Sequence, residues 1–374
     1  MATLRPHIAE LARWLEAPRD GATPPGWSAR DVDDWPAWRR AVTVQGLAAH
    51  LAHGPVAAAA AASLPPTEVA WLYEQDERNT ARLRRLHDDL AQLLAAAAGH
   101  GLEVMPLKGA LLTTMPGEDP YRRPMADLDL LVRPADRAAG ARLLTELGWR
   151  HVPEHAPRPT HDTFVAGDGR VVDPVGEHPD NPRRIDLHTE VKRHLWGWVD
   201  DDDLTPYLWA GATRSSVLGE PATVPTIAAL FAHLAIHASS DLLVGRGRLV
   251  GWVDLGRLAA RAPWPADVPH PRVAYPALRL AARAQPSLMG GLDLAALEAS
   301  TVPSALARWA ASVPLDDRCG LSLGRPPDRP SSTGARWERW RPARWRLAVA
   351  YGDQPLPIGL ARHGALVARR LSGR

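Results

Sequence analysis

The stretch Arg123–Val132, which reads RPMADLDLLV, decides the fold of this chain. Acidic and apolar residues alternate in it, and successive side chains of a β-strand point to opposite faces of the sheet. We therefore expect a strand over 128–132, with two of its leucines in the core and with Asp127 and Asp129 together on the other face. Two carboxylates about 7 Å apart on a rigid strand can hold a hard cation such as Mg²⁺.

A second segment, Ile185-Asp186-Leu187-His188, repeats this pattern further along the chain. If the two strands are neighbours, Asp186 brings a third carboxylate to the same face, which is the minimum for a two-metal site with ions about 3.5–4 Å apart. Asp173 is an alternative third carboxylate, but it precedes Pro174 in a turn-like context, so we favour Asp186. His188 faces either the site or a structural hydrogen bond.

The lysine content draws attention to one position. Lys and Arg together number 44, yet the only lysines are Lys108 and Lys192. Arginine replaces lysine wherever only a positive charge matters in such a composition, so a retained lysine marks a place where the smaller ammonium is needed. Lys108-Gly109 lies where a strand over 102–107 passes into a short helix. Glycine permits a close backbone approach there, and the lysine supplies a compact charge for a phosphate.

The combined motifs resemble the DNA polymerase β-type nucleotidyltransferase superfamily. Within it, the chain is similar to the uncharacterised bacterial nucleotidyltransferase family, which has Lys-Gly where most of the superfamily has Gly-Ser. The resemblance covers roughly residues 75–262 and takes in the helix around Asn79 and Arg82, Lys108-Gly109, the Asp127 strand, a helix that ends in Leu-Gly-Trp and the Asp186 strand.

The resemblance implies Mg²⁺-dependent transfer of a nucleoside monophosphate from an NTP to an acceptor hydroxyl, with release of pyrophosphate. By it, Asp127 and Asp129 bind two Mg²⁺ ions, and Asp186 completes the catalytic metal and helps to deprotonate the acceptor. Arg123 reaches the triphosphate or pairs with a nearby carboxylate. The nucleotide-binding residues implied are Lys108, Gly109, Arg123 and His188.

The composition excludes several classes of protein. The chain has 374 residues, of which 45% are hydrophobic and 23% charged, as in ordinary globular proteins. One cysteine, Cys319, excludes an intrachain disulfide framework and a cysteine-based zinc cluster. No apolar run approaches the 18 residues of a membrane span, so we expect a cytoplasmic protein with no membrane partner.

The pattern of elements predicts an α+β fold, in which a small mixed-sheet core with α/β character lies between helical regions. We expect an N-terminal helical cap over 1–77, the nucleotidyltransferase core over 78–204, a C-terminal helical domain over 205–323, and a linker and tail over 324–374. Within the core, the short apolar runs 163–166 and 170–172 flank Gly167-Asp168-Gly169 and predict a hairpin.

The tail leaves the acceptor open. Residues 335–374 hold nine arginines, three tryptophans and only two acidic residues. Basic residues interleaved with aromatic ones can bind RNA, although docking of the tail on the protein is the favoured interpretation. The acceptor is therefore a small molecule, a peptide or a protein, with RNA as an alternative. A degenerate protein that binds a nucleotide or a partner without catalysis is the non-enzymatic alternative.

Overall fold

The computed structural model describes residues 4–16, 34–54, 56–117, 119–153, 161–173, 178–193, 202–243, 245–262, 269–286, 289, 292–316, 319 and 356–371. These residues fall into two compact units. One unit comprises 18–191 and 204–230, and the other comprises 1–17, 192–203 and 231–374. The fold is mixed helix and sheet, as the sequence predicts, and its larger sheet lies wholly in the first unit.

A five-stranded sheet organises the first unit. Its strands are β1 (Val104–Pro106), β2 (Asp127–Val132), β3 (Arg150–Val152), β4 (His161–Val165) and β5 (Arg184–His188), in the order β1-β2-β5-β4-β3. The sheet is mixed, because β2 and β5 run parallel whereas every other neighbouring pair is antiparallel.

The register of the parallel pair follows from the apolar alternation in both strands. Leu128 lies beside Ile185 and Leu130 beside Leu187, and all four side chains are buried. A shift of one residue would turn these side chains to the opposite face and would place the carboxylates in the core. Asp129 therefore stands beside Asp186.

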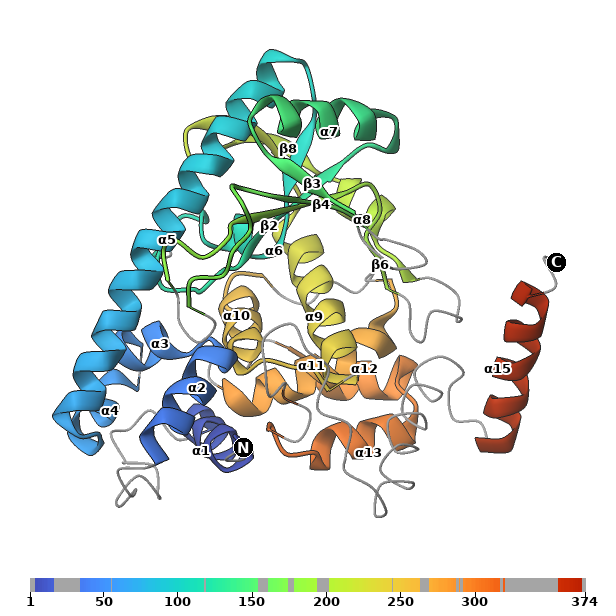
Figure 1. Ribbon diagram of the computed structural model, residues 1–374. Coiled ribbons are helices and arrows are strands. Elements are labelled where there is room, and N and C mark those ends of the chain that lie inside the picture. The colour runs from blue at the N-terminus through green and yellow to red at the C-terminus, as the bar shows by residue number, and fades with distance from the viewer. Residues whose placement is uncertain are drawn as a thin grey trace. The chain divides into compact units, whose positions relative to one another are not determined.

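Helices of the first unit support the sheet. In Figure 1, α5 (Pro66–Gly99) runs past the sheet, and α7 (Arg137–Glu146) lies near β3. Gly140 of α7 faces Leu187, so α7 covers the apolar face of β5. The other helices of this unit are α2 (Trp35–Gln45), α3 (Ala48–His53), α4 (Ala57–Ser63), α6 (Lys108–Leu112), α8 (Thr205–Trp209) and a 3₁₀ turn, η2 (Pro134–Asp136). A separate hairpin joins β8 (Thr213–Val217) to β9 (Glu220–Val224), and β9 packs against β1 and α5.

The second unit is mainly helical. Its described elements are α1 (Arg5–Glu16), α10 (Leu249–Ala259), α11 (Pro271–Ala284), α12 (Leu294–Thr301), α13 (Ser304–Ser312), α15 (Leu356–Leu371) and a short ribbon of β6 (Lys192–Arg193) and β7 (Asp202–Asp203). The helix α9 (Ile227–Leu243) begins in the first unit and continues into this one. The core forms around α11, which packs on α1, α10, α12 and α13. Arg283 of α11 also pairs with Glu16 of α1 at 2.7 Å.

One predicted element is wrong. Residues 170–172 form no strand, and Val171 and Val172 are half exposed. The hairpin partner of β4 is instead β3, and its other neighbour is β5. Adjacent residues of a strand point to opposite faces, so a strand here would still leave one of the two valines on the face away from the core. The β-propensity of Val171 and Val172 is therefore outweighed by the pairing of β4 with β3 and β5.

Candidate active site

Three carboxylates lie on the face of the sheet opposite to the buried leucines. Asp127 and Asp129 are two residues apart on β2, and Asp186 is the register partner of Asp129 on β5. Register partners on parallel strands point to the same face. The structure therefore brings together the three acidic residues that the sequence singled out.

Lys108 neutralises one of these carboxylates. Its Nζ donates a hydrogen bond to Asp129 Oδ1 at 2.7 Å, and the lysine side chain is only 18% exposed. The backbone brings the two residues together, because the Leu107 N–H donates to the Asp129 carbonyl at 2.9 Å. Lys108 also has a φ of 45°, a left-handed conformation that costs a residue with a Cβ about 1–3 kcal/mol. Backbone strain of this kind is concentrated at functional sites.

His188 supplies the second partner of Asp129. Its Nε2 lies 3.0 Å from the same oxygen, Oδ1, and both side chains are buried. An ionised carboxylate can only accept hydrogen bonds, so the imidazole donates through Nε2. His188 therefore lies beside the acidic cluster and is hydrogen-bonded to one of its carboxylates.

The pKa values of Asp127 and Asp129 shift in opposite directions. Burial and the repulsion of Asp129 and Asp186 raise the pKa of Asp127 to about 6, although Lys108 and Arg123 oppose this. Burial acts in the same direction on Asp129, but Lys108 and His188 outweigh it and hold the pKa of Asp129 well below its usual range. One carboxylate is thus fully charged, whereas its neighbour has an excess of negative charge around it.

Two residues that the sequence did not point to hold Asp186. Thr163 Oγ1 donates to Asp186 Oδ1 at 2.8 Å, and His161 Nε2 lies 3.5 Å from Asp186 Oδ2. Both residues are on β4, where Thr163 is the register partner of Asp186 and His161 that of His188. The alternation His161-x-Thr163 was the available signal, because it repeats the polar spacing of β5. It was missed because the expected strand began at Thr163.

Gly109 and Arg123 meet beside the carboxylates. A methyl group on Gly109 would come within 2.7 Å of Arg123 Nη1 and of Met125 Sδ. The glycine therefore lets the segment before β2 lie directly on α6. Asp173, the alternative third acid, is elsewhere: its Oδ2 lies 3.5 Å from Arg78 Nη1 on α5, and its backbone is bonded to Asn181.

The donor chemistry of this face fits a magnesium ion. Carboxylate oxygens on rigid strands are the ligands that Mg²⁺ prefers, and the pKa of Asp127 is raised first by burial and then by the charge of Asp129 and Asp186. Among the described residues, no three His, Cys, Asp or Glu side chains are arranged closely enough to hold a metal as they stand. Lys108 and His188 both hydrogen-bond to the same oxygen of Asp129, Oδ1.

Comparison with known protein families gives a match over the same region. A profile described as an uncharacterised nucleotidyltransferase family matches residues 31–282, more than half of the chain. The chain belongs to this family. The matched residues include the whole five-stranded sheet and every candidate site residue. This nucleotidyltransferase is therefore an enzyme that transfers a nucleotidyl group.

Solved structures resemble this nucleotidyltransferase only remotely. The antibiotic-resistance factor ANT(2'')-Ia, solved in solution, is 17% identical with a TM-score of 0.31, and the match covers 61% of this chain and 95% of that one. An antigenic nucleotidyltransferase-like protein from Paracoccidioides brasiliensis is 16% identical with a TM-score of 0.35, covering 60% and 95%. No curated protein matches the chain. Among the described residues, no helix is both long and apolar enough to cross a bilayer.

Proposed function

We propose that this nucleotidyltransferase moves a nucleoside monophosphate from an NTP to an acceptor hydroxyl and releases pyrophosphate at the face formed by β2 and β5. The observation that carries the proposal is the in-register placement of Asp129 and Asp186 on parallel strands, with Lys108 on Asp129. A partly buried cluster of three carboxylates, with Asp129 itself buried, is unfavourable to maintain in a folded protein. A site for phosphoryl transfer accounts for such a cluster, because this reaction needs cations and carboxylates at fixed positions.

The chain would hold the metal and the nucleotide through separate groups. Asp127, Asp129 and Asp186 would bind Mg²⁺, which would neutralise charge on the triphosphate. Lys108 and Arg123 are positive charges close enough to lower the pKa of Asp127, so they would bind the phosphate oxygens. Lys108 has one donor on Asp129 and further ammonium donors available for a phosphate.

Two contacts would keep the acidic residues in their roles during transfer. The acceptor oxygen forms a bond to the α-phosphorus as the bond to the pyrophosphate oxygen breaks, and the acceptor proton passes to Asp186. Thr163 fixes the orientation of the Asp186 carboxylate by its hydrogen bond to Oδ1. His188 does the same for Asp129. Held carboxylates lose little entropy when the substrate arrives.

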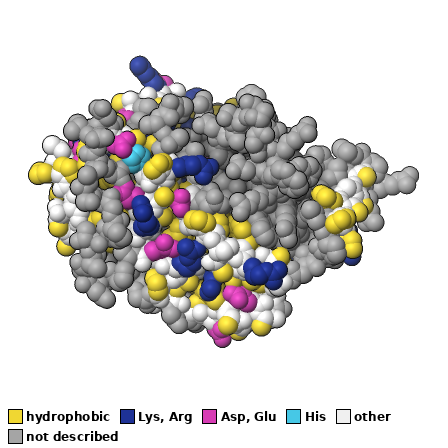
Figure 2. Space-filling model, turned by 90° about the horizontal axis from the view of Figure 1, so that it is seen from below, with side chains coloured by type: hydrophobic (Ala, Val, Ile, Leu, Met, Phe, Trp, Pro, Cys, Tyr) yellow, Lys and Arg dark blue, Asp and Glu magenta, His cyan; other side chains and the backbone are white. Residues whose placement is uncertain are grey.

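The acceptor that we propose is a hydroxyl of a small molecule, a peptide or a protein. The RNA alternative depends on residues 335–374, of which the structure describes only 356–371. Over the described atoms of the face shown in Figure 2, Lys and Arg side chains are interspersed with Asp and Glu side chains. These described atoms therefore form no continuous positive surface that would bind the RNA backbone.

The test is transfer of label from each of the four NTPs carrying ³²P at the α-phosphate. The purified protein is incubated with Mg²⁺ and with fractionated acceptors, and the products are identified by mass spectrometry, with the protein itself included as an acceptor. We expect label on a hydroxyl and one pyrophosphate per transfer, both abolished by EDTA. Binding of all four NTPs without transfer to any fraction would contradict the proposal.

A further inference from the structure

Arg82 of α5 is a buried cation next to the residues that precede β2 and β5. It is 4% exposed, and its guanidinium donates four hydrogen bonds to backbone carbonyls. The acceptors are the carbonyls of Met125 at 3.2 Å, Ala126 at 3.1 Å, Asn181 at 2.8 Å and Pro182 at 2.9 Å. Burial of a guanidinium is unfavourable unless its donors are satisfied, and bonds from a charged donor are stronger than neutral ones.

These four carbonyls lie just before the two strands that carry the carboxylates. Ala126 immediately precedes Asp127, and Pro182 comes two residues before Arg184, the first residue of β5. Asp127 and Arg184 are register partners, so the four carbonyls lie at the same end of the parallel pair. One side chain thus joins a segment 43–44 residues away in the sequence to another that is 99–100 residues away.

Nothing in the strand ladder can replace this connection. The pairing of β2 with β5 begins at Asp127 and Arg184, and the preceding segments contain Pro124 and Pro182. Proline has no N–H to donate, so a ladder cannot continue through it. The carbonyls before the strands therefore need another donor, and the guanidinium supplies one to each.

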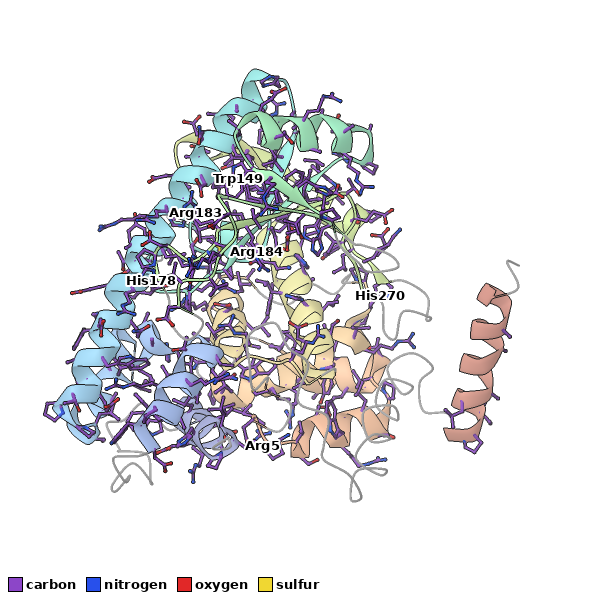
Figure 3. All side chains as sticks on the ribbon, in the orientation of Figure 1. Arg5, Trp149, His178, Arg183, Arg184 and His270 are labelled. Atoms are coloured by element: carbon purple, nitrogen blue, oxygen red, sulfur yellow. The ribbon has the colours of Figure 1, made fainter. Side chains whose placement is uncertain are left out.

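Neighbouring residues of α5 hold the same two segments. The Asn79 side-chain amide donates to the carbonyl of Tyr121, in the loop that leads to Arg123. Arg183, labelled in Figure 3, binds Asp89 of α5. Arg82 lies between these two contacts along the helix, and it alone of the three bonds both segments.

We propose that Arg82 is a positioning residue of the active site: its guanidinium fixes the starts of β2 and β5 and thereby the spacing of Asp127 and Asp129 from Asp186. The inference rests on the proposed function of these carboxylates. Arg82 bonds the backbone rather than the carboxylates, so it acts through the strands. A displacement of about 1 Å at such a site costs about 100-fold in rate.

The test compares Arg82→Ala and Arg82→Lys with Arg85→Ala. Arg85 is a matched control: it lies one turn further along α5 and donates to the Pro179 carbonyl at 3.1 Å, but it is exposed. The rate of pyrophosphate release is divided by the concentration of folded protein, and circular dichroism gives the folded fraction of each variant. We expect Arg82→Ala to lower kcat about 100-fold with little change in KM for the NTP. Arg82→Lys should restore little, because one ammonium cannot serve four diverging carbonyls.

Chemical rescue separates positioning from mere stability. Millimolar guanidinium should raise the rate of Arg82→Ala about tenfold or more, because it can re-form the same bonds, whereas ammonium should not. The affinity for Mn²⁺, measured by electron paramagnetic resonance, is a readout that does not depend on turnover. We expect it to fall in Arg82→Ala and Arg82→Lys and to stay unchanged in Arg85→Ala.

Two results would overturn the inference. One is a rate per folded protein, and a Mn²⁺ affinity, in Arg82→Lys equal to those of the wild type. The other is a loss in Arg82→Ala that guanidinium does not relieve. If Arg82→Ala does not fold, the rate and the Mn²⁺ affinity of Arg82→Lys decide the test. A wild type that releases no pyrophosphate but binds Mn²⁺ would contradict the proposed function alone, and the Mn²⁺ affinities would still decide the role of Arg82. No Mn²⁺ binding and no activity would overturn both.

Discussion

Asp127 and Asp129 lie on the same face of β2, two residues apart, and have opposite pKa shifts. Asp129 has Lys108 at 2.7 Å and His188 at 3.0 Å, whereas Asp127 has a raised pKa because of its burial and its neighbouring carboxylates. The folded protein therefore holds one paired and one poorly compensated carboxylate. The poorly compensated one is a cost to stability that a bound cation would remove.

The opposite shifts predict opposite effects on stability. Asp127→Asn should stabilise the metal-free protein at pH 7.5 by about 1–3 kcal/mol, because it removes an ionised carboxylate whose pKa is raised to about 6. Asp129→Asn should destabilise it, because Lys108 and His188 lose an ionised partner. Urea denaturation in the presence of EDTA measures both. Destabilisation by both variants would contradict the electrostatic account.

The stabilisation by Asp127→Asn should also depend on pH. The folded protein retains the Asp127 proton up to about pH 6, whereas the unfolded chain releases it near the ordinary value of 3.8. Between these values the folded state binds more protons, so the contribution of Asp127 to stability falls as the pH rises. The advantage of Asp127→Asn should be absent near pH 4, grow through pH 4–6 and be constant above. An advantage independent of pH would mean that the asparagine acts by packing.

We expect NTP binding and turnover to require a lysine at position 108. Lys108→Met should weaken NTP binding in Mg²⁺ about 10- to 100-fold, because the nucleotide loses a charged donor. Lys108→Arg keeps the charge but places a larger planar group where the side chain is 18% exposed, so turnover should fall. Lys192→Met is the matched control, since Lys192 pairs with Asp203 at 3.9 Å. Wild-type turnover in Lys108→Arg would mean that any cation suffices.

Thr163 should affect turnover more than stability. Thr163→Val keeps the shape of the side chain but removes the hydrogen bond to Asp186 Oδ1, so we expect kcat to fall about tenfold. Thr145→Val is the control, because the exposed Thr145 donates its hydrogen bond to the Ala141 carbonyl within α7. Equal rates in the two variants would show that Thr163 does not orient Asp186.

Local patterns predicted the centre of the fold, and they failed where distant segments decide the structure. The alternation around Asp129 and Asp186 predicted both strands, because a buried face specifies the register. The place of β4 between β5 and β3 could not be predicted, since pairing partners far apart in sequence leave no local signal. For the same reason the role of Arg82 could not be predicted, because its carbonyl acceptors at Asn181 and Pro182 lie about a hundred residues away. The Lys108 motif predicted a cation near phosphate, but not its left-handed backbone or its bond to Asp129.

The most direct test of the central claim is Mg²⁺-dependent transfer of the α-phosphate label by the wild type, Asp129→Asn and Asp186→Asn, with the NTP and acceptor that serve the wild type best. Each variant is first shown to be folded by circular dichroism. We predict transfer with stoichiometric pyrophosphate in the wild type and a loss of at least about 1,000-fold in each variant, because the proposed function places both carboxylates at the reacting phosphate. Full transfer by a folded Asp129→Asn or Asp186→Asn protein would contradict the assignment of this face as the active site.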